Sequence, residues 1–158
     1  MKNLVLTRID DRLIHGQVMT AWSRVTRAEQ VLVVDDAVAQ DEFMINVLEN
    51  AVPESMAIGV FNKEDAVTFL SEPLEAPTIV LVKVPETIEY LVNHGVVISE
   101  VDLGGMGANK NRDSLYHTIS ASGEEKETFK RLLKKGLNVF IQIMPQNDKV
   151  DLKNILLK

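Results

Sequence analysis

The hydrophobic residues of the chain fall into two alternating patterns. Short continuous apolar runs, such as residues 31–34, are typical of strands buried on both faces of a parallel sheet. Between these runs, apolar residues recur at intervals of three and four, which is the spacing of one helix face. The predicted strands begin at residue 4 and lie at 31–34, 56–61, 78–83, 101–103 and 139–144, with a weaker one at 117–121.

The helical segments carry boundary signals as well as apolar faces. Asn62 can cap one helix, and Pro85 suits the first position of another. Ser122 and Glu125 have the spacing of a capping box before a further helix. A last short helix is expected at 148–158. The residues expected on buried helix faces include Val18, Ala21, Trp22, Val25, Phe43, Val47, Leu48, Ala51, Ala66, Phe69 and Leu70.

This alternation of strands and helices predicts an α/β fold. We expect a single open three-layer sandwich, with a mostly parallel central sheet of about six to seven strands and helices on both faces. Residues 1–158 contain no linker, repeat or low-complexity segment, so one domain is expected. Ligand sites in such folds form beyond the carboxyl ends of the strands, which directs attention to residues 8–16, 35–36 and 104–113.

Composition narrows the class of protein. The chain has no cysteine, which excludes disulfides and thiolate metal clusters and favours a reducing, cytoplasmic compartment. No apolar run approaches the roughly 18 residues of a membrane span, and no signal-peptide pattern opens the sequence. The net charge of −6 argues against a nucleic-acid-binding protein.

The charge is unevenly distributed along the chain. Residues 1–27 hold five basic and two acidic residues, a balance of +3, whereas the remainder carries −9. Arg8 and Arg12 lie where the first strand leads into the first helix, a position at which free backbone N–H groups often bind anions. The local excess therefore predicts a phosphate cradle. Arg24 and Arg27 lie about a helix length further on and are better placed to dock a partner.

The same loop holds the groups that phosphoryl chemistry needs. His15 offers a nitrogen nucleophile near neutral pH, and Arg12 offers a fork of donors suited to phosphate oxygens. A simpler interpretation makes His15 an ordinary helix-terminal histidine and makes Asp10 or Asp11 a cap of the helix. A covalent phosphohistidine carrier and a regulatory domain that binds phosphate without covalent chemistry both remain open. The supporting and site-lining candidates are Asp10, Asp11, Gly16, Gln17, Arg8, Trp22, Asp35 and Gly105.

The loop also resembles a known family. Ten consecutive residues from Ile9 to Val18, followed by Trp22, are similar to the signature of the enzyme IIB component of the mannose/fructose/sorbose-type sugar phosphotransferase system. A match of this length is far more specific than a three-residue motif. Further blocks that resemble the family lie at 34–36, 103–106 and 142–145.

The resemblance implies a phosphocarrier without a metal or organic cofactor. In this family the histidine at the position of His15 receives phosphate on Nδ1 from a phosphohistidine of the IIA protein or domain. It then donates the phosphate to a sugar imported by the membrane IIC and IID subunits. The resemblance implies that Arg12 stabilises the phosphoryl group and that Asp10 or Asp11 orients Arg12 or the loop backbone. It also implies peripheral association with the inner face of the membrane through IIC and IID, and it is compatible with a homodimer.

One position departs from the family pattern. Many relatives carry a histidine after the Gly-Gly-Met block, where this chain has Gly107. The other two histidines, His94 and His117, are expected to be structural, and the three lack the paired spacing of metal ligands. The residues that can supply polar contacts in place of the missing histidine are Asn109, Lys110 and Arg112.

Overall fold

A computed structural model describes residues 1–157 of the chain. The strands are β1 (Leu4–Asp10), β2 (Gln30–Val34), β3 (Ala57–Phe61), β4 (Thr78–Val82), β5 (Glu100–Gly105), β6 (Asp113–Tyr116), β7 (Ile119–Ala121), β8 (Asn138–Ile141) and β9 (Val150–Asp151). The helices are α1 (Gly16–Thr26), α2 (Asp36–Ala39), α3 (Glu42–Ala51), α4 (Lys63–Leu70), α5 (Pro85–Asn93), α6 (Gly123–Lys134) and α7 (Lys153–Leu156).

The central sheet has seven strands in the order β3-β2-β4-β1-β5-β8-β9. All neighbouring pairs are parallel except β8 and β9, which are antiparallel. The predicted open α/β sandwich with a mostly parallel sheet is therefore confirmed. Because β1 lies between β4 and β5, its carboxyl end opens near the middle of the sheet, where α/β folds place their ligand sites.

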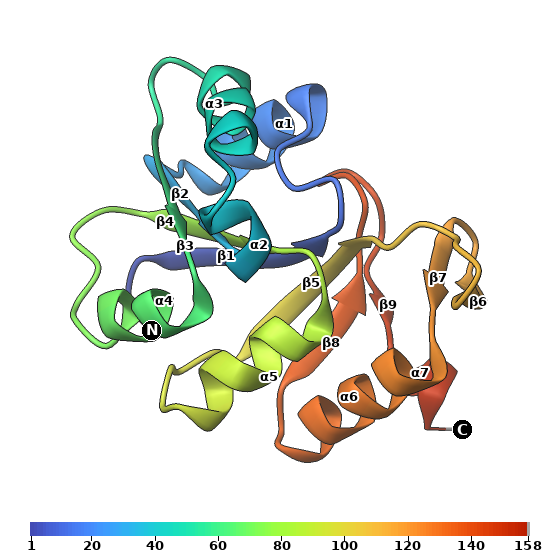
Figure 1. The fold of residues 1–158 in the computed structure, drawn as a ribbon. Coiled ribbons are helices and arrows are strands. Elements are labelled where there is room, and N and C mark those ends of the chain that lie inside the picture. Colours follow the sequence, from blue (N-terminus) through green and yellow to red (C-terminus); the bar gives the residue numbers. More distant parts are fainter. Residues whose placement is uncertain (158) are drawn as a thin grey trace.

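Helices cover both faces of the sheet, as predicted (Figure 1). One core cluster joins residues of α4, α5 and α6 to one face, and a second joins residues of α1 and α3 to the other. The predicted helix starts are also confirmed. The side chain of Asn62 caps α4, Pro85 is the first residue of α5, and Ser122 with Glu125 forms a capping box at α6.

Four apolar residues expected on buried helix faces are exposed instead. Val25 is 65% exposed, Phe43 is 77% exposed, Val47 is 43% exposed and Phe69 is 38% exposed. In α1 the buried residues are Met19 and Trp22, so the buried stripe is rotated away from Val25. In α3 only Leu48 is buried, because this helix covers the sheet with a narrow stripe.

The weakest sequence patterns gave the least accurate elements. The helix expected at 148–158 is instead the short strand β9 followed by α7, and residue 158 lies outside the described part. Phe140 of β8 pairs with Asp151, so a ladder with β8 replaces the first turn of the expected helix. The weak strand expected at 117–121 is shorter, because His117 has a φ of 48° and lies in the turn between β6 and β7. None of the helices in residues 1–157 is long and apolar enough to cross a membrane.

Candidate functional site

The loop between β1 and α1 presents His15 to solvent. His15 is the N-cap residue of α1, with extended backbone angles and a side chain that makes no capping hydrogen bond. Its ring is exposed, as are Gly16 and Gln17 in the first turn. A Cβ at Gly16 would meet nothing within 4 Å, so the backbone there is open to a ligand. First-turn N–H groups have no partner within a helix, so this end of α1 can accept an anion next to the imidazole.

Arg12, which lies three residues before His15, is held in place by Asp10. Its Nε donates to Oδ1 of Asp10 at 3.0 Å and its Nη2 to Oδ2 at 3.0 Å, while its backbone N–H also donates to Oδ1. This hydrogen bonding to Asp10 raises the pKa of Arg12. Asp10 is completely buried, whereas the side chain of Arg12 is 44% exposed. One end of the guanidinium is therefore anchored in the fold while the other can meet a ligand.

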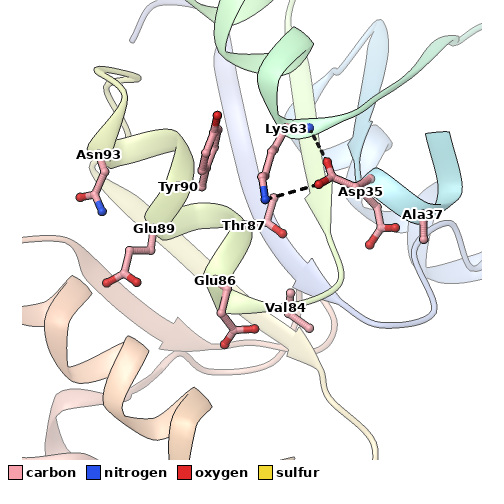
Figure 2. A pocket seen from close by; sticks show the side chains of 10 residues that line it. Asp35, Ala37, Lys63, Val84, Glu86, Thr87, Glu89, Tyr90 and Asn93 are labelled. Atoms are coloured by element: carbon pink, nitrogen blue, oxygen red, sulfur yellow. Dashed lines mark hydrogen bonds and ion pairs between the residues drawn. The ribbon is translucent and has the colours of Figure 1, made fainter. Parts of the chain in front are cut away.

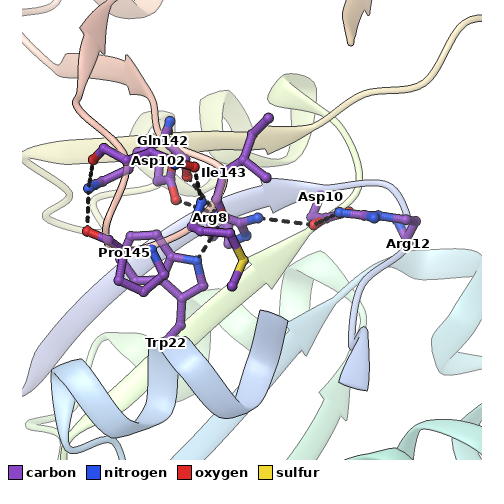
Figure 3. Close-up of polar contacts among 10 residues, drawn as sticks. Arg8, Asp10, Arg12, Trp22, Asp102, Gln142, Ile143 and Pro145 are labelled. Carbon is purple, nitrogen blue, oxygen red and sulfur yellow. Dashed lines mark hydrogen bonds and ion pairs between the residues drawn. The ribbon is translucent and has the colours of Figure 1, made fainter. Parts of the chain in front are cut away.

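Arg8 lies beneath the loop and not along its surface, which corrects the expectation that it lines the phosphate cradle. β1 extends to Asp10, and the side chain of Arg8 is only 2% exposed. Its Nη1 donates to Oδ2 of Asp102 at 2.5 Å and to the carbonyl of Gln142 at 3.0 Å, and its Nη2 donates to Oδ2 of Asp10 at 3.3 Å. Figure 3 shows the guanidinium of Arg8 between Asp102 and Asp10, with Arg12 beyond Asp10.

Sequence reasoning missed Asp102, the centre of this buried cluster. It lies in the middle of β5 with no exposed side-chain area. Burial raises the pKa of Asp102 to about 6, although the charge and hydrogen bond of Arg8 act in the opposite direction. One feature of the sequence could have found it: a carboxylate stands between Val101 and Leu103, inside an apolar run. A carboxylate at such a buried position requires a charged or hydrogen-bonding partner.

Two glycines of β5 make room for the cluster. A Cβ at Gly104 would lie 2.0 Å from Cζ of Arg8, and a Cβ at Gly105 would lie 2.7 Å from Oδ1 of Asp10. The carbonyl of Gly105 also accepts the backbone N–H of Asp11 at 2.9 Å. Gly105 therefore touches the loop from below, and the glycine pair is a steric requirement of the buried charges.

Asp11 connects the loop to the segment that follows β5. Its Oδ2 accepts the backbone N–H of Gly107 at 2.8 Å and Nη1 of Arg112 at 3.0 Å. Arg112 also holds Glu125, at the start of α6, through two hydrogen bonds of 2.9 Å. Of the three residues expected to supply polar contacts in this segment, Arg112 therefore reaches the candidate site. Asn109 instead accepts the N–H of Asn111, and no side-chain hydrogen bond of Lys110 occurs within residues 1–157.

Trp22 lies against the buried cluster and not in the open site. Its indole Nε1 donates to the carbonyl of Ile143 at 3.1 Å, and Cζ of Arg8 lies 5.4 Å from the centre of its ring. The side chain is 6% exposed. Trp22 therefore covers Arg8 and ties α1 to the segment after β8.

Asp35 belongs to a different hollow. Its side chain caps α2 by accepting the N–H of Val38. It lines a cavity of about 490 Å³ with Lys63, Glu86 and Tyr90 among others, and no residue of the β1–α1 loop takes part (Figure 2). In the part of the chain that the structure describes, the side-chain hydrogen bond of Asp35 is the one to Val38, and none joins it to the β1–α1 loop. Within residues 1–157, no group of three histidine, aspartate or glutamate side chains is arranged to hold a metal ion.

Known proteins resemble this chain over nearly all of its length. A family model described as the PTS system sorbose subfamily IIB component matches residues 4–158. The PTS fructose-specific EIIB component of Bacillus subtilis is 34% identical over 158 residues, which are 99% of this chain and 97% of that protein. The PTS mannose-specific EIIAB component of Escherichia coli is 30% identical over 155 residues, which are 97% of this chain and 48% of that protein. The solved IIBSor domain of the sorbose permease from Klebsiella pneumoniae has a TM-score of 0.93 and 29% identity, over 98% of this chain and 96% of that one.

Proposed function

Because the chain belongs to the family of PTS sorbose subfamily IIB components, which are phosphotransferase subunits, we propose that it carries a phosphoryl group on His15. The observation that carries this proposal is the arrangement of the β1–α1 loop. An exposed imidazole lies at the first turn of α1, three residues after an arginine whose guanidinium Asp10 immobilises. Phosphoryl transfer depends mainly on positioning and on charge stabilisation, and this loop supplies both.

In the first transfer, His15 accepts the group from a phosphohistidine. The lone pair of one ring nitrogen, Nδ1 by resemblance to the family, attacks the phosphorus atom. A new N–P bond forms on His15 while the N–P bond of the donor breaks, and the donor imidazole keeps that electron pair. One proton passes through solvent from the other ring nitrogen of His15 to the donor ring, so both rings end neutral.

In the second transfer, a hydroxyl oxygen of the sugar attacks the phosphorus atom on His15. An O–P bond forms, the N–P bond breaks, and the hydroxyl proton returns the imidazole of His15 to its neutral form. In both steps the exposed end of Arg12 and the first-turn N–H groups of α1 neutralise charge on the phosphoryl oxygens. Neither step requires a metal ion or an organic cofactor.

The donor in this proposal is a IIA protein or domain. The Escherichia coli relative is described as an EIIAB component, and this chain matches 48% of its length, which supports a IIA unit as the partner of a IIB unit. The acceptor is a sugar bound by membrane IIC and IID subunits. The chain would then act at the cytoplasmic face of the membrane, held there by contacts with those subunits, and residues 1–158 would form its single domain.

Labelling with radioactive phosphate tests the proposal. The wild-type chain is incubated with phosphoenolpyruvate, the general phosphotransferase proteins and a mannose-type IIA domain. We expect an acid-labile label on the wild type and none on His15→Ala. His94→Ala and His117→Ala are matched controls, because each removes another exposed histidine, and both should label normally. An unlabelled wild type, with a IIA domain that is itself labelled, would reject the carrier in favour of non-covalent phosphate binding.

A further inference from the structure

Four charged side chains form a continuous line from the interior of the sheet to the candidate site. Asp102 of β5 pairs with Arg8 of β1 at 2.5 Å, and Arg8 pairs with Asp10 at 3.3 Å. Asp10 in turn pairs with Arg12 at 3.0 Å. Figure 3 shows how these side chains follow one another. The first three are almost completely buried, and only Arg12 reaches solvent.

We propose that Arg8 and Asp102 are positioning residues, which fix the carboxylate of Asp10 so that it presents the guanidinium of Arg12 to the phosphoryl group. This inference deepens the function proposed above and rests on it. Neither residue touches the phosphoryl group, because both are enclosed by the fold. They act only through Asp10.

The geometry shows what Arg8 contributes to Asp10. Both carboxylate oxygens of Asp10 are engaged by Arg12, and Oδ2 also accepts Nη2 of Arg8 from the opposite side. The carboxylate therefore cannot turn without breaking a bond to one of the two arginines. Asp102 does the same for Arg8, since its Oδ2 accepts Nη1 of Arg8 while its Oδ1 accepts the backbone N–H of Gln142.

A contribution to stability does not account for this arrangement. Buried ion pairs are weak stabilisers, and well-packed apolar residues of similar volume often replace them without loss. Here the pairs also require glycine at two consecutive positions of a central strand, and glycine is a poor strand residue. Such clusters are found where a reactive group must be held rigidly.

The decisive experiment removes the charges while keeping the volume. The double variant Arg8→Met/Asp102→Leu is compared with the wild type and with Arg131→Met/Glu89→Gln, which removes an ion pair on α5 and α6. For each protein we measure the melting temperature, the kcat and KM for a phosphorylated mannose-type IIA domain, and the NMR signal of the Arg12 Nε–H group.

We expect the double variant to stay folded while its kcat falls about ten- to a hundredfold, the usual effect of losing a supporting residue. The KM for the IIA domain should hardly change, because the docking surface is intact. The Nε–H signal of Arg12 should broaden or shift. The control variant should match the wild type in kcat, KM and the Arg12 signal.

Two outcomes would overturn the inference: a folded double variant with the wild-type kcat, or one with an unchanged Arg12 signal. If the double variant does not fold, Asp102→Asn, which keeps the side-chain shape, is judged by the same measurements and the same criteria. The NMR signal is read on unphosphorylated protein and does not depend on the proposed function. A wild type that fails to label at His15 would reject the proposed function alone.

Discussion

Replacing Gly104 by alanine should disrupt the buried ion pairs of Arg8 through a steric clash. The new Cβ would lie 2.0 Å from Cζ of Arg8 and 2.3 Å from both terminal nitrogens, well inside the ordinary contact distance of 3.4 Å or more. The guanidinium would have to move by more than about 1 Å, which breaks its pairs with Asp102 and Asp10. Breaking a buried ion pair so that one charge is left without its partner costs about 3–5 kcal/mol. This is a large part of the roughly 5–15 kcal/mol that stabilises a typical domain.

Thermal unfolding measures this loss. For a chain of this length, 1 kcal/mol corresponds to roughly 2–4 °C, so Gly104→Ala should lower the melting temperature by roughly 6–20 °C. Gly123→Ala is the matched control, since a Cβ at that exposed first position of α6 meets nothing within 4 Å. It should leave the melting temperature unchanged or raise it slightly. A Gly104→Ala protein that melts with the wild type would show that Arg8 can relocate freely, and the steric argument would fail.

Three further predictions concern the site and its surroundings. Arg12→Ala should slow phosphoryl transfer at least about tenfold in single-turnover measurements, because one preorganised donor is worth ~2.7–4 kcal/mol; unchanged kinetics would remove Arg12 from the mechanism. Burial would raise the pKa of Glu125, but hydrogen bonds, chiefly from Arg112, outweigh it and lower that pKa from 4.5. The stabilisation of the fold by ionised Glu125 is therefore present above pH 4.5 and is lost as the pH falls through the lowered pKa. In urea unfolding at a series of pH values, Glu125→Gln should weaken the fall of the free energy of unfolding at acid pH. An equally steep fall in the variant would contradict this. Asp11→Ala should speed hydrogen exchange at the Gly107 amide at least about fivefold, because its charged acceptor is lost; equal exchange rates would show that water replaces that acceptor.

The sequence predicts the inner strands of the sheet well because β2, β4 and most of β5 are buried on both faces. An apolar run such as Val31–Val34 is enough by itself to indicate a buried strand, without information from distant residues. The short elements are different. β9 has two residues and exists because it pairs with β8, so no local pattern could distinguish it from a helix. Phe43 and Val47 looked buried because a helical repeat shows an apolar face without showing what covers it.

The candidate site divides in the same way. Asp10, Arg12 and His15 lie close together in the sequence, so the sequence alone is enough to propose that they share one loop. The support beneath it depends on contacts across 94 residues between Arg8 and Asp102, which no spacing rule reveals. Arg8 looked like part of the loop because a charged residue near a strand end usually faces solvent. Only the fold shows that β1 continues past Arg8 and turns it inward.

The anchoring of Arg12 by Asp10 also has an entropic consequence. A free arginine side chain carries about 2 kcal/mol of rotamer entropy, which a flexible clamp would lose each time it closed on a phosphoryl group. Here most of that loss occurs once, when the chain folds, because Nε and Nη2 are already bound. In the proposed function, each transfer would therefore start from an ordered arginine. The activation entropy of transfer should accordingly be less unfavourable in this chain than in a relative whose arginine moves freely.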